Sequence, residues 1–260
     1  MLRGMLEAVG VYKVYEEWLL DQVKKTEVPK HVGVILDGNR RWAAERSLSF
    51  IEGHRRGARK GEDFLDWCLN LGIETVTVYV FSSENFQRPE SEVRNILSLI
   101  EDQAMRLESD ERIHEQKVRV KALGRLDNLP ESLRKVLQRM ENSTRAYGEH
   151  YLNIAIAYGG RAEIIDAAKK IAKDVKAQKV APDQIDEDFF MQYLYTAHLP
   201  NPYPDLIIRT SGEERLSGFL LWQSAYSELC FIDVWWPDFR KIDLLRAIRT
   251  YQRRVRRFGK

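Results

Sequence analysis

The stretch HVGVILDGNRRWA, residues 31–43, places an apolar run directly before an acid, a glycine, an amide and two arginines. The run over 31–36 predicts a buried β-strand, because near-continuous apolar segments of this length are typical of strands covered on both faces. Asp37 stands where that strand ends. It could form a helix N-cap or an ion pair with Arg41, or it could belong to a binding site. The stretch alone leaves these alternatives open.

Short β-rich runs and longer helical patterns alternate along the rest of the chain. The predicted strands are 31–36, 75–81, 118–123, 152–157, 205–209 and 228–233. Between them lie stretches such as 91–107, whose apolar residues recur at helical spacing. This alternation predicts an α/β fold with a mostly parallel six-stranded sheet flanked by helices. No linker separates a second domain, so we expect a single domain over residues 1–260.

The two ends of the chain have their own character. Residues 1–27 form a predicted N-terminal helical extension, in which 5–23 are typical of an amphipathic helix. The apolar residues near one side of that helix are Leu6, Val9, Val14, Trp18 and Leu19. Residues 240–260 form a predicted basic helix and tail, in which nine lysines and arginines stand against one acid, Asp243. We expect both ends to be helical additions to the sheet.

The composition is that of an ordinary soluble globular protein, with 44% hydrophobic and 31% charged residues. A net charge of +2 does not favour a polyanion binder over the whole surface. Cys68 and Cys230 lie inside apolar runs, which favours buried reduced thiols over a disulfide framework. The sequence has neither a bilayer-spanning apolar stretch nor the features of a signal peptide. We expect a cytoplasmic protein, with contact to a membrane surface left open.

Polar residues gather at the carboxyl ends of five successive predicted strands. The segments are DGNRR, SSENFQR, GR, YGGR and RTSGEERLS. In an open parallel sheet these ends line the ligand crevice, so the five segments should converge. One polar, glycine-rich loop is ordinary, but an arginine after each of five strands is not. Guanidinium groups and helix N-terminal amides bind phosphate oxygens, and neither a Walker A nor a GxGxxG motif is present. The pattern favours a ligand that carries phosphate groups, but it does not support an ordinary nucleotide-binding site.

Asp37 is unexpected among arginines that would hold a phosphate. Mg²⁺ would resolve the conflict, because it binds carboxylate and phosphate oxygens together. Glu228, at the start of the sixth predicted strand, is a candidate second oxygen ligand, although read alone it is an exposed strand-end acid. His54, in EGHRRG, is a candidate proton carrier or phosphate ligand, and equally an ordinary loop histidine.

Taken together, these segments resemble the cis-prenyltransferase family of the undecaprenyl diphosphate synthase type, and they are similar to its archaeal members. The matching blocks, in order, are LDGNRRWA with GH following, FSSENFQRP, YGGR, DLIIRTSGEERLSGFLLWQSAYSEL and the final RRFG. The resemblance implies a Mg²⁺-dependent enzyme that condenses isopentenyl diphosphate units onto an allylic diphosphate primer, farnesyl or geranylgeranyl diphosphate. The implied product is a long-chain polyprenyl diphosphate used as a lipid carrier. A homodimer and a hydrophobic tunnel between sheet and helices are implied as well.

The resemblance also implies roles for individual residues. Asp37 and Asn85 match catalytic positions, and Asp37 and Glu228 match metal ligands, Glu228 reaching across the dimer. The residues that match substrate-binding positions are Gly38, Asn39, Arg40, Arg41, Trp42, His54, Ser82, Phe86, Arg88, Arg209, Arg215, Ser217, Arg257 and Gly259. In the family pattern Arg257 and Gly259 complete the partner's isopentenyl diphosphate site.

The chain departs from the family pattern at two positions. Phe50 stands where many members have an arginine that binds the allylic diphosphate. Either Arg40 or Arg46 supplies the missing charge, or allylic binding differs. Phe86 replaces a common tryptophan, and Glu92 begins the helix that the resemblance places along the tunnel wall.

Two other functions compete with the enzyme. A non-catalytic stabilising subunit of a heteromeric prenyltransferase is the main alternative, but such partners typically lose the strand-one acid or the RTSG block, and this chain keeps both. The basic tail RRVRRFGK suggests nucleic-acid binding, which a pI of about 8.4 does not favour. We expect no nucleic-acid partner.

Overall fold

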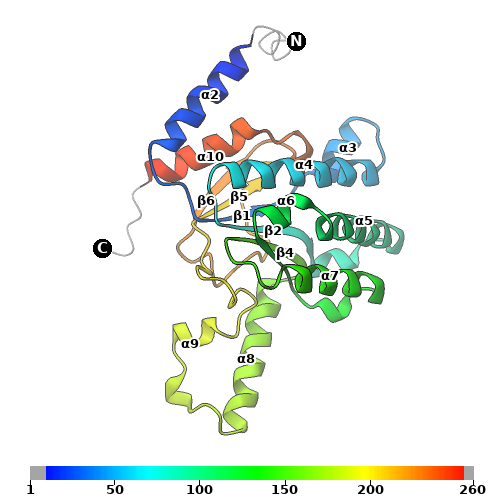
Figure 1. The fold of residues 1–260 in the computed structure, drawn as a ribbon. Coiled ribbons are helices and arrows are strands. Elements are labelled where there is room, and N and C mark those ends of the chain that lie inside the picture. The colour runs from blue at the N-terminus through cyan, green and yellow to red at the C-terminus, as the bar shows by residue number, and fades with distance from the viewer. Residues whose placement is uncertain (1–9, 255–260) are drawn as a thin grey trace.

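Six parallel β-strands form the centre of the protein in a computed structural model, which describes residues 10–254 (Figure 1). The strands are β1 (His31–Ile35), β2 (Thr75–Ser82), β3 (Val118–Leu123), β4 (His150–Tyr158), β5 (Leu206–Thr210) and β6 (Glu228–Ile232). Their order in the sheet is β3-β4-β2-β1-β5-β6, and every neighbouring pair is parallel. The predicted single α/β domain is confirmed, with a sheet that is parallel throughout.

The chain also forms helices (Figure 1), several of which pack against one face of the sheet, whereas turn residues such as Tyr195 and Phe219 pack against the other face. Among the described residues the helices are α2 (Val11–Lys24), α3 (Asn39–Glu45), α4 (Phe50–Asn70), α5 (Glu90–Glu108), α6 (Glu111–Glu115), α7 (Glu131–Thr144), α8 (Gly160–Lys176), α9 (Glu187–Met191) and α10 (Lys241–Arg253), with short 3₁₀ helices η1 (Ser83–Gln87), η2 (Leu126–Asn128), η3 (Pro182–Gln184) and η4 (Trp236–Asp238). The larger core joins one face to α4, α5, α7 and α10. The opposite face carries a smaller aromatic cluster.

Strand β1 is buried on both faces, as its apolar run predicts. Val32 and Val34 belong to the larger core, and Ile35 belongs to the smaller one. Gly33 lies so close to Phe219 that an added Cβ would stand 3.0 Å from its ring. The central position of β1 therefore brings its last residues, and Asp37 after them, to the middle of the sheet edge.

The N-terminal helix α2 packs along α10 (Figure 1). Leu19 and Val23 are its buried residues. Val14 and Trp18 are 67% and 49% exposed, so the predicted apolar side of this helix is only partly covered. Val14 and Trp18 stay exposed because α10 packs against the side of α2 that contains Leu19 and Val23. The positions 5–9 of the predicted helix lie outside the described residues, as does the tail after residue 254.

Helix α3 rests on α4 at two glycines. A Cβ on Gly53 would lie 2.2 Å from the backbone oxygen of Asn39, and one on Gly57 would lie 2.1 Å from Asn39 Oδ1. The Gly57 carbonyl also accepts a hydrogen bond from Trp236 Nε1 at 2.8 Å. These contacts fix the short helix that follows Asp37, and so they fix one wall of the strand-end cleft.

We predict that Gly53→Ala destabilises the protein by about 1–3 kcal/mol, because the new methyl group must displace the α3 backbone. Gly61→Ala is the matched control on the same helix, since nothing lies within 4 Å of a Cβ there. It should stabilise by up to about 1 kcal/mol, the helix-propensity difference between the two residues. Thermal unfolding followed by circular dichroism measures both, and equal melting temperatures for the two variants would contradict this account of the contact.

Candidate active site

A cleft of about 1140 Å³ opens at the carboxyl ends of the strands. Arginines from all five polar segments line it, namely Arg40, Arg41, Arg88, Arg125, Arg161 and Arg209. The predicted site residues along it are Asp37, Gly38, Asn39, Arg40, Arg41, His54, Ser82, Asn85, Arg88, Arg209 and Ser217. The structure thus brings together segments that are as far apart in the sequence as residues 37 and 217.

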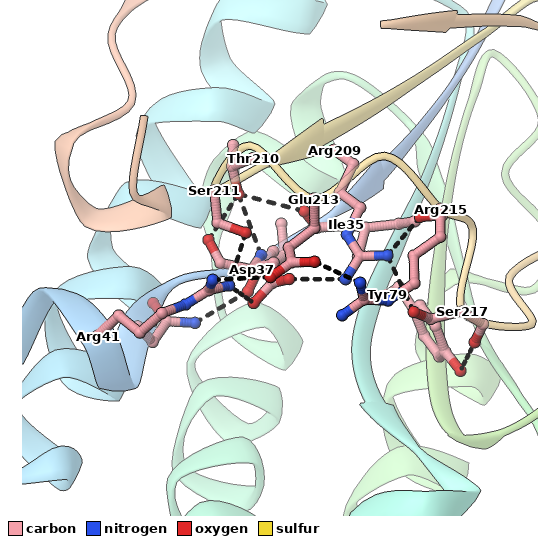
Figure 2. A network of polar contacts seen from close by, with 12 residues as sticks. Ile35, Asp37, Arg41, Tyr79, Arg209, Thr210, Ser211, Glu213, Arg215 and Ser217 are labelled. Carbon is pink, nitrogen blue, oxygen red and sulfur yellow. Dashed lines mark hydrogen bonds and ion pairs between the residues drawn. The ribbon is translucent and has the colours of Figure 1, made fainter. Parts of the chain in front are cut away.

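Asp37 lies at the centre of a network between β1 and β5 (Figure 2). Its Oδ2 accepts a hydrogen bond from Arg209 at 2.8 Å, and its Oδ1 accepts one from Arg41 at 3.1 Å. The backbone of Asp37 is held as well, because its N–H donates to Thr210 Oγ1 at 3.1 Å and its carbonyl accepts from that hydroxyl at 2.7 Å. The sequence left open whether Asp37 forms an ion pair or belongs to a binding site. In the structure it does both, because its ion pairs with Arg209 and Arg41 lie inside the cleft.

The environment of Asp37 keeps it ionised. Burial alone would raise the pKa of this carboxyl, but the Arg209 hydrogen bond, with the charges of Arg209 and Arg41, brings the pKa below its ordinary value. An ionised carboxylate in this position can bind a cation, whereas its lowered pKa makes it a weak proton acceptor. It also offsets part of the positive charge that the guanidinium groups bring to the cleft.

The loop after β5 has an unusual backbone. Ser211, Ser217 and Leu220 have φ values of 81°, 48° and 43°, in the left-handed region that non-glycine residues rarely adopt. Such conformations persist only where the surroundings hold them. Arg209 supplies part of that support, since its Nη1 donates to Ser217 Oγ at 2.9 Å and to the Arg215 carbonyl (Figure 2). The loop is therefore held by the same arginine that binds Asp37.

Tyr79 and Glu213 also belong to this network, although the sequence did not single them out. The Tyr79 hydroxyl donates to the carbonyls of Tyr158 at 3.2 Å and Ser217 at 3.4 Å, and burial raises the pKa of Tyr79. Glu213 accepts from Arg41 at 3.0 Å and pairs with Arg215. Glu213 stands in the quoted segment RTSGEERLS, so its motif carried a signal, whereas Tyr79 lies inside a strand where nothing marks it.

His54 lines the cleft on the α4 side. Burial lowers its pKa to about 4, and the charges of Arg88 and Arg40 contribute to the decrease. Its Nε2 is buried without a hydrogen-bond partner. The imidazole is neutral at physiological pH, so in the free protein it is a weak proton acceptor.

Three of the predicted substrate-binding side chains in residues 10–254 do not line the cleft. Arg215 is paired with Glu213. The Trp42 ring lies beneath the guanidinium of Arg46, 4.6 Å from its centroid. Phe86 packs edge-on against Phe81 in the larger core, with ring centroids 4.9 Å apart. Their substrate contacts stay predictions.

Glu228 lies far from Asp37 within the chain. It is the first residue of β6 and pairs in register with Leu206 at the start of β5, so it stands at the opposite edge of the sheet from the cleft. Its carboxylate is ion-paired with Arg254. Asp37 and Glu228 therefore lie at opposite edges of the sheet within one chain. Arg257 and Gly259 lie outside the described residues.

The residues at Asp37 fit a Mg²⁺ ion that is bound together with phosphate. No group of three or more His, Cys, Asp or Glu side chains is arranged for a metal ion in residues 10–254. Mg²⁺ commonly takes one or two carboxylates and fills its other positions with phosphate oxygens and water. The ionised carboxylate of Asp37, surrounded by arginines that suit a phosphate, matches that donor set.

An apolar cavity of about 160 Å³ adjoins the cleft. It lies between α4, α5 and the larger-core face of the sheet, and its apolar lining includes Leu65, Val78 and Ile100. His54 and Ile96 line both the cleft and the cavity. A polar, cationic opening and an apolar chamber therefore share a wall.

Comparison with known proteins shows which family has this sequence and fold. The family model of prenyltransferases of the undecaprenyl diphosphate synthase type matches residues 35–259. The chain belongs to this family. A tritrans,polycis-undecaprenyl-diphosphate synthase (geranylgeranyl-diphosphate specific) of Methanopyrus kandleri is 56% identical over 96% of this chain and 92% of its own length. A protein of the same name from Methanocaldococcus jannaschii is 51% identical, over 98% of this cis-prenyltransferase and 91% of the relative.

A solved structure supports the same conclusion. Lavandulyl diphosphate synthase from Lavandula x intermedia, crystallised with dimethylallyl diphosphate, aligns with a TM-score of 0.85 and 38% identity. The alignment covers 90% of this cis-prenyltransferase and 99% of the plant enzyme. Within residues 10–254, the prenyltransferase has no helix whose length and apolar content would let it cross a membrane.

We predict that His54 of the free enzyme titrates with a pKa of about 4 in an NMR experiment. Because the charges of Arg88 and Arg40 help to lower this value, saturating inorganic diphosphate should raise the pKa by offsetting them. His31 is the control, since its pKa is also about 4 but burial in the sheet is the cause. A free-enzyme pKa near 6.5 for His54, or an equal change at His31, would contradict the prediction.

Proposed function

We propose that this cis-prenyltransferase extends an allylic diphosphate with isopentenyl diphosphate units and makes a long-chain polyprenyl diphosphate that serves as a lipid carrier. The observation that carries the proposal is the ionised Asp37 held between Arg209 and Arg41 in an arginine-lined cleft. The adjoining apolar cavity supports a hydrocarbon substrate. A diphosphate head and an isoprenoid tail match the two compartments.

Geranylgeranyl diphosphate is the primer we propose over farnesyl diphosphate. The two archaeal relatives named above carry geranylgeranyl-diphosphate specificity in their names, and this chain covers nearly their whole length. The NRRWA form of the first motif is similar to archaeal members. Identity of about half the residues over that length supports the same choice of primer.

The cleft residues divide between the two substrates in this proposal. Gly38, Asn39, Arg40 and Arg41 would bind the allylic diphosphate, and Arg209 with Ser217 would bind isopentenyl diphosphate. Arginines already in place stabilise the charge that develops on the departing diphosphate, because they need no reorganisation during the reaction. Holding the allylic carbon against the isopentenyl double bond supplies the remaining rate enhancement through positioning.

Asp37 is the residue that would hold Mg²⁺, which supplies further neutralisation of the departing diphosphate. Asn85 is proposed to act beside Asp37 from η1, where its Oδ1 accepts the Ser82 N–H at 3.0 Å and so fixes its side chain. The proton lost from the isopentenyl unit would go to Asp37, His54 or a substrate phosphate. The pKa of about 4 at His54 and the lowered pKa of Asp37 make both side chains weak bases, which favours a substrate phosphate as the acceptor.

The growing chain is proposed to enter the apolar cavity between α4 and α5. Each buried methylene contributes ~0.8 kcal/mol, so every added unit favours the apolar side. A cavity of about 160 Å³ is close to the size that holds one benzene molecule. A long product therefore requires α4 and α5 to separate, which would open the cavity into the predicted tunnel.

The enzyme is proposed to act as a homodimer. The matched tail residues Arg257 and Gly259 would then complete the partner's isopentenyl diphosphate site, and Glu228 would approach Asp37 only across the dimer. The placement of Glu228 at the far edge of the sheet supports a role that one chain cannot perform alone. Peripheral membrane contact also stays a prediction, which flotation with lipid vesicles would measure.

Incubation of the purified chain with Mg²⁺, radiolabelled isopentenyl diphosphate and each allylic primer tests the function. We expect long polyprenyl products, formed faster from geranylgeranyl than from farnesyl diphosphate. Inactivity of the chain alone, reversed by a second subunit, would instead support the stabilising-subunit alternative.

Two variants sharpen this assay. Asp37→Asn should lower product formation at least about a hundredfold, the usual range for losing one electrostatic group in the transition state. Asp238→Asn is the control, because Asp238 also pairs with an arginine, Arg46 at 2.8 Å, but does not line the cleft. Near-normal turnover by folded Asp37→Asn would overturn the proposed mechanism.

We predict that Arg257→Ala and Asp37→Asn chains, each inactive alone, regain activity when mixed. A hybrid dimer would pair the intact Asp37 of one chain with the intact Arg257 of the other, which restores one complete site. The measurement is product formation after subunit exchange that is verified by native mass spectrometry. No recovery despite exchange would show that Arg257 does not act in trans.

A further inference from the structure

Glu92 is a buried carboxylate beside the arginine-lined cleft. It lies in the first turn of α5, and its side chain is only 5% exposed. One turn later, Ile96 lines both the cleft and the apolar cavity. A buried acid in such a place is costly unless it is paired, so its partners define what it does.

Both partners of Glu92 are arginines of the cleft. Arg88 Nη1 donates to Glu92 Oε1 at 3.1 Å, and Arg40 Nη1 lies 3.6 Å from the same oxygen. Arg40 comes from α3, whereas Arg88 follows η1, so one carboxylate oxygen connects two separate walls of the cleft. His54, Arg40 and Arg88 all line the cleft.

The structure also shows which of the two candidate arginines, Arg40 and Arg46, faces the cleft. Arg46 donates to Asp238 at 2.8 Å and to the Trp42 carbonyl at 3.1 Å, and it stands outside the cleft lining. Arg40 lines the cleft. Of the two, only Arg40 can contribute its charge to the cleft directly.

We infer that Glu92 is a positioning residue that holds Arg40 and Arg88 together as one diphosphate-binding pair. Two guanidinium groups repel each other, and a buried carboxylate between them offsets that repulsion before the ligand arrives. The pair would receive the allylic diphosphate in place of the arginine that Phe50 replaces. This inference rests on the proposed function for the identity of that ligand.

Positioning and simple charge effects predict opposite results at Glu92. If the carboxylate only diminished the positive charge of the cleft, neutralising it would tighten the binding of an anion. If it holds the two arginines in place, neutralising it releases them and weakens binding. The direction of the change therefore separates the two roles.

The experiment measures binding of inorganic diphosphate by calorimetry to the full chain and to Glu92→Gln. We expect about tenfold weaker binding in the variant, the ratio that corresponds to one charge-assisted hydrogen bond. Glu90→Gln is the matched control, since Glu90 also lies in the first turn of α5 but pairs at the surface with Arg94. Both changes remove one negative charge from the same helix end, so the control separates the loss of a charge from the loss of the buried contact with Arg40 and Arg88.

Two further readouts exclude a merely structural role. The KM for the allylic diphosphate should increase about tenfold in Glu92→Gln while the KM for isopentenyl diphosphate stays within about twofold. In an Arg40→Ala background, Glu92→Gln should have a smaller effect on diphosphate binding, because the two residues act as a pair. Unchanged or tighter diphosphate binding by folded Glu92→Gln would overturn the inference and leave the proposed function standing. Absence of diphosphate binding by the unaltered chain would overturn both.

Discussion

The ion pair between Asp37 and Arg209 is the interaction on which the rest of the site depends. Arg209 is only 4% exposed, and a buried guanidinium without a partner would be strongly destabilising. Asp37 supplies that partner from the neighbouring strand, with an Oδ2–Nη2 distance of 2.8 Å. Because β1 and β5 are adjacent and parallel, their carboxyl ends lie side by side. The sheet topology therefore makes the pair possible, and the pair in turn supports the left-handed backbone of the loop at Ser217.

Other arginines of the cleft are also held in place by pairing with an acidic side chain. Each of three acids lies between two arginines: Asp37 between Arg209 and Arg41, Glu92 between Arg88 and Arg40, and Glu213 between Arg41 and Arg215. Without these acids the clustered guanidinium groups would repel each other and move apart. The arginines still outnumber the acids, so the cleft keeps a surplus of positive charge for an anion. Its donors are in place before any ligand binds, which is what electrostatic preorganisation requires.

The strands and their polar ends were predictable because both follow from local rules. Every strand begins and ends within two residues of its predicted bounds, since buried apolar runs are visible in the sequence. The convergence of arginines followed from parallel pairing alone. The burial of individual helix residues could not be predicted, because it depends on tertiary packing. Nothing local distinguishes the exposed Trp18 from the buried Leu19 on α2, and the depth of Glu92 depends on how α5 meets the cleft. The far-edge position of Glu228 could have been foreseen, because a residue that opens a parallel strand lies opposite the carboxyl ends.

The neutral histidine at the shared wall shows why the cleft and the cavity can coexist. A charged group facing an apolar chamber would pay a desolvation cost, and His54 avoids it because burial and two neighbouring arginines keep its pKa at about 4. Arg40 and Arg88 are in turn held by Glu92 on the cleft side. The arginines of the cleft thus adjoin a cavity whose lining is mainly apolar, with Glu62, Arg106 and Asp110 as its charged members. A ligand that spans both must have an anionic head joined to a hydrocarbon tail, which is the chemical form of an allylic diphosphate.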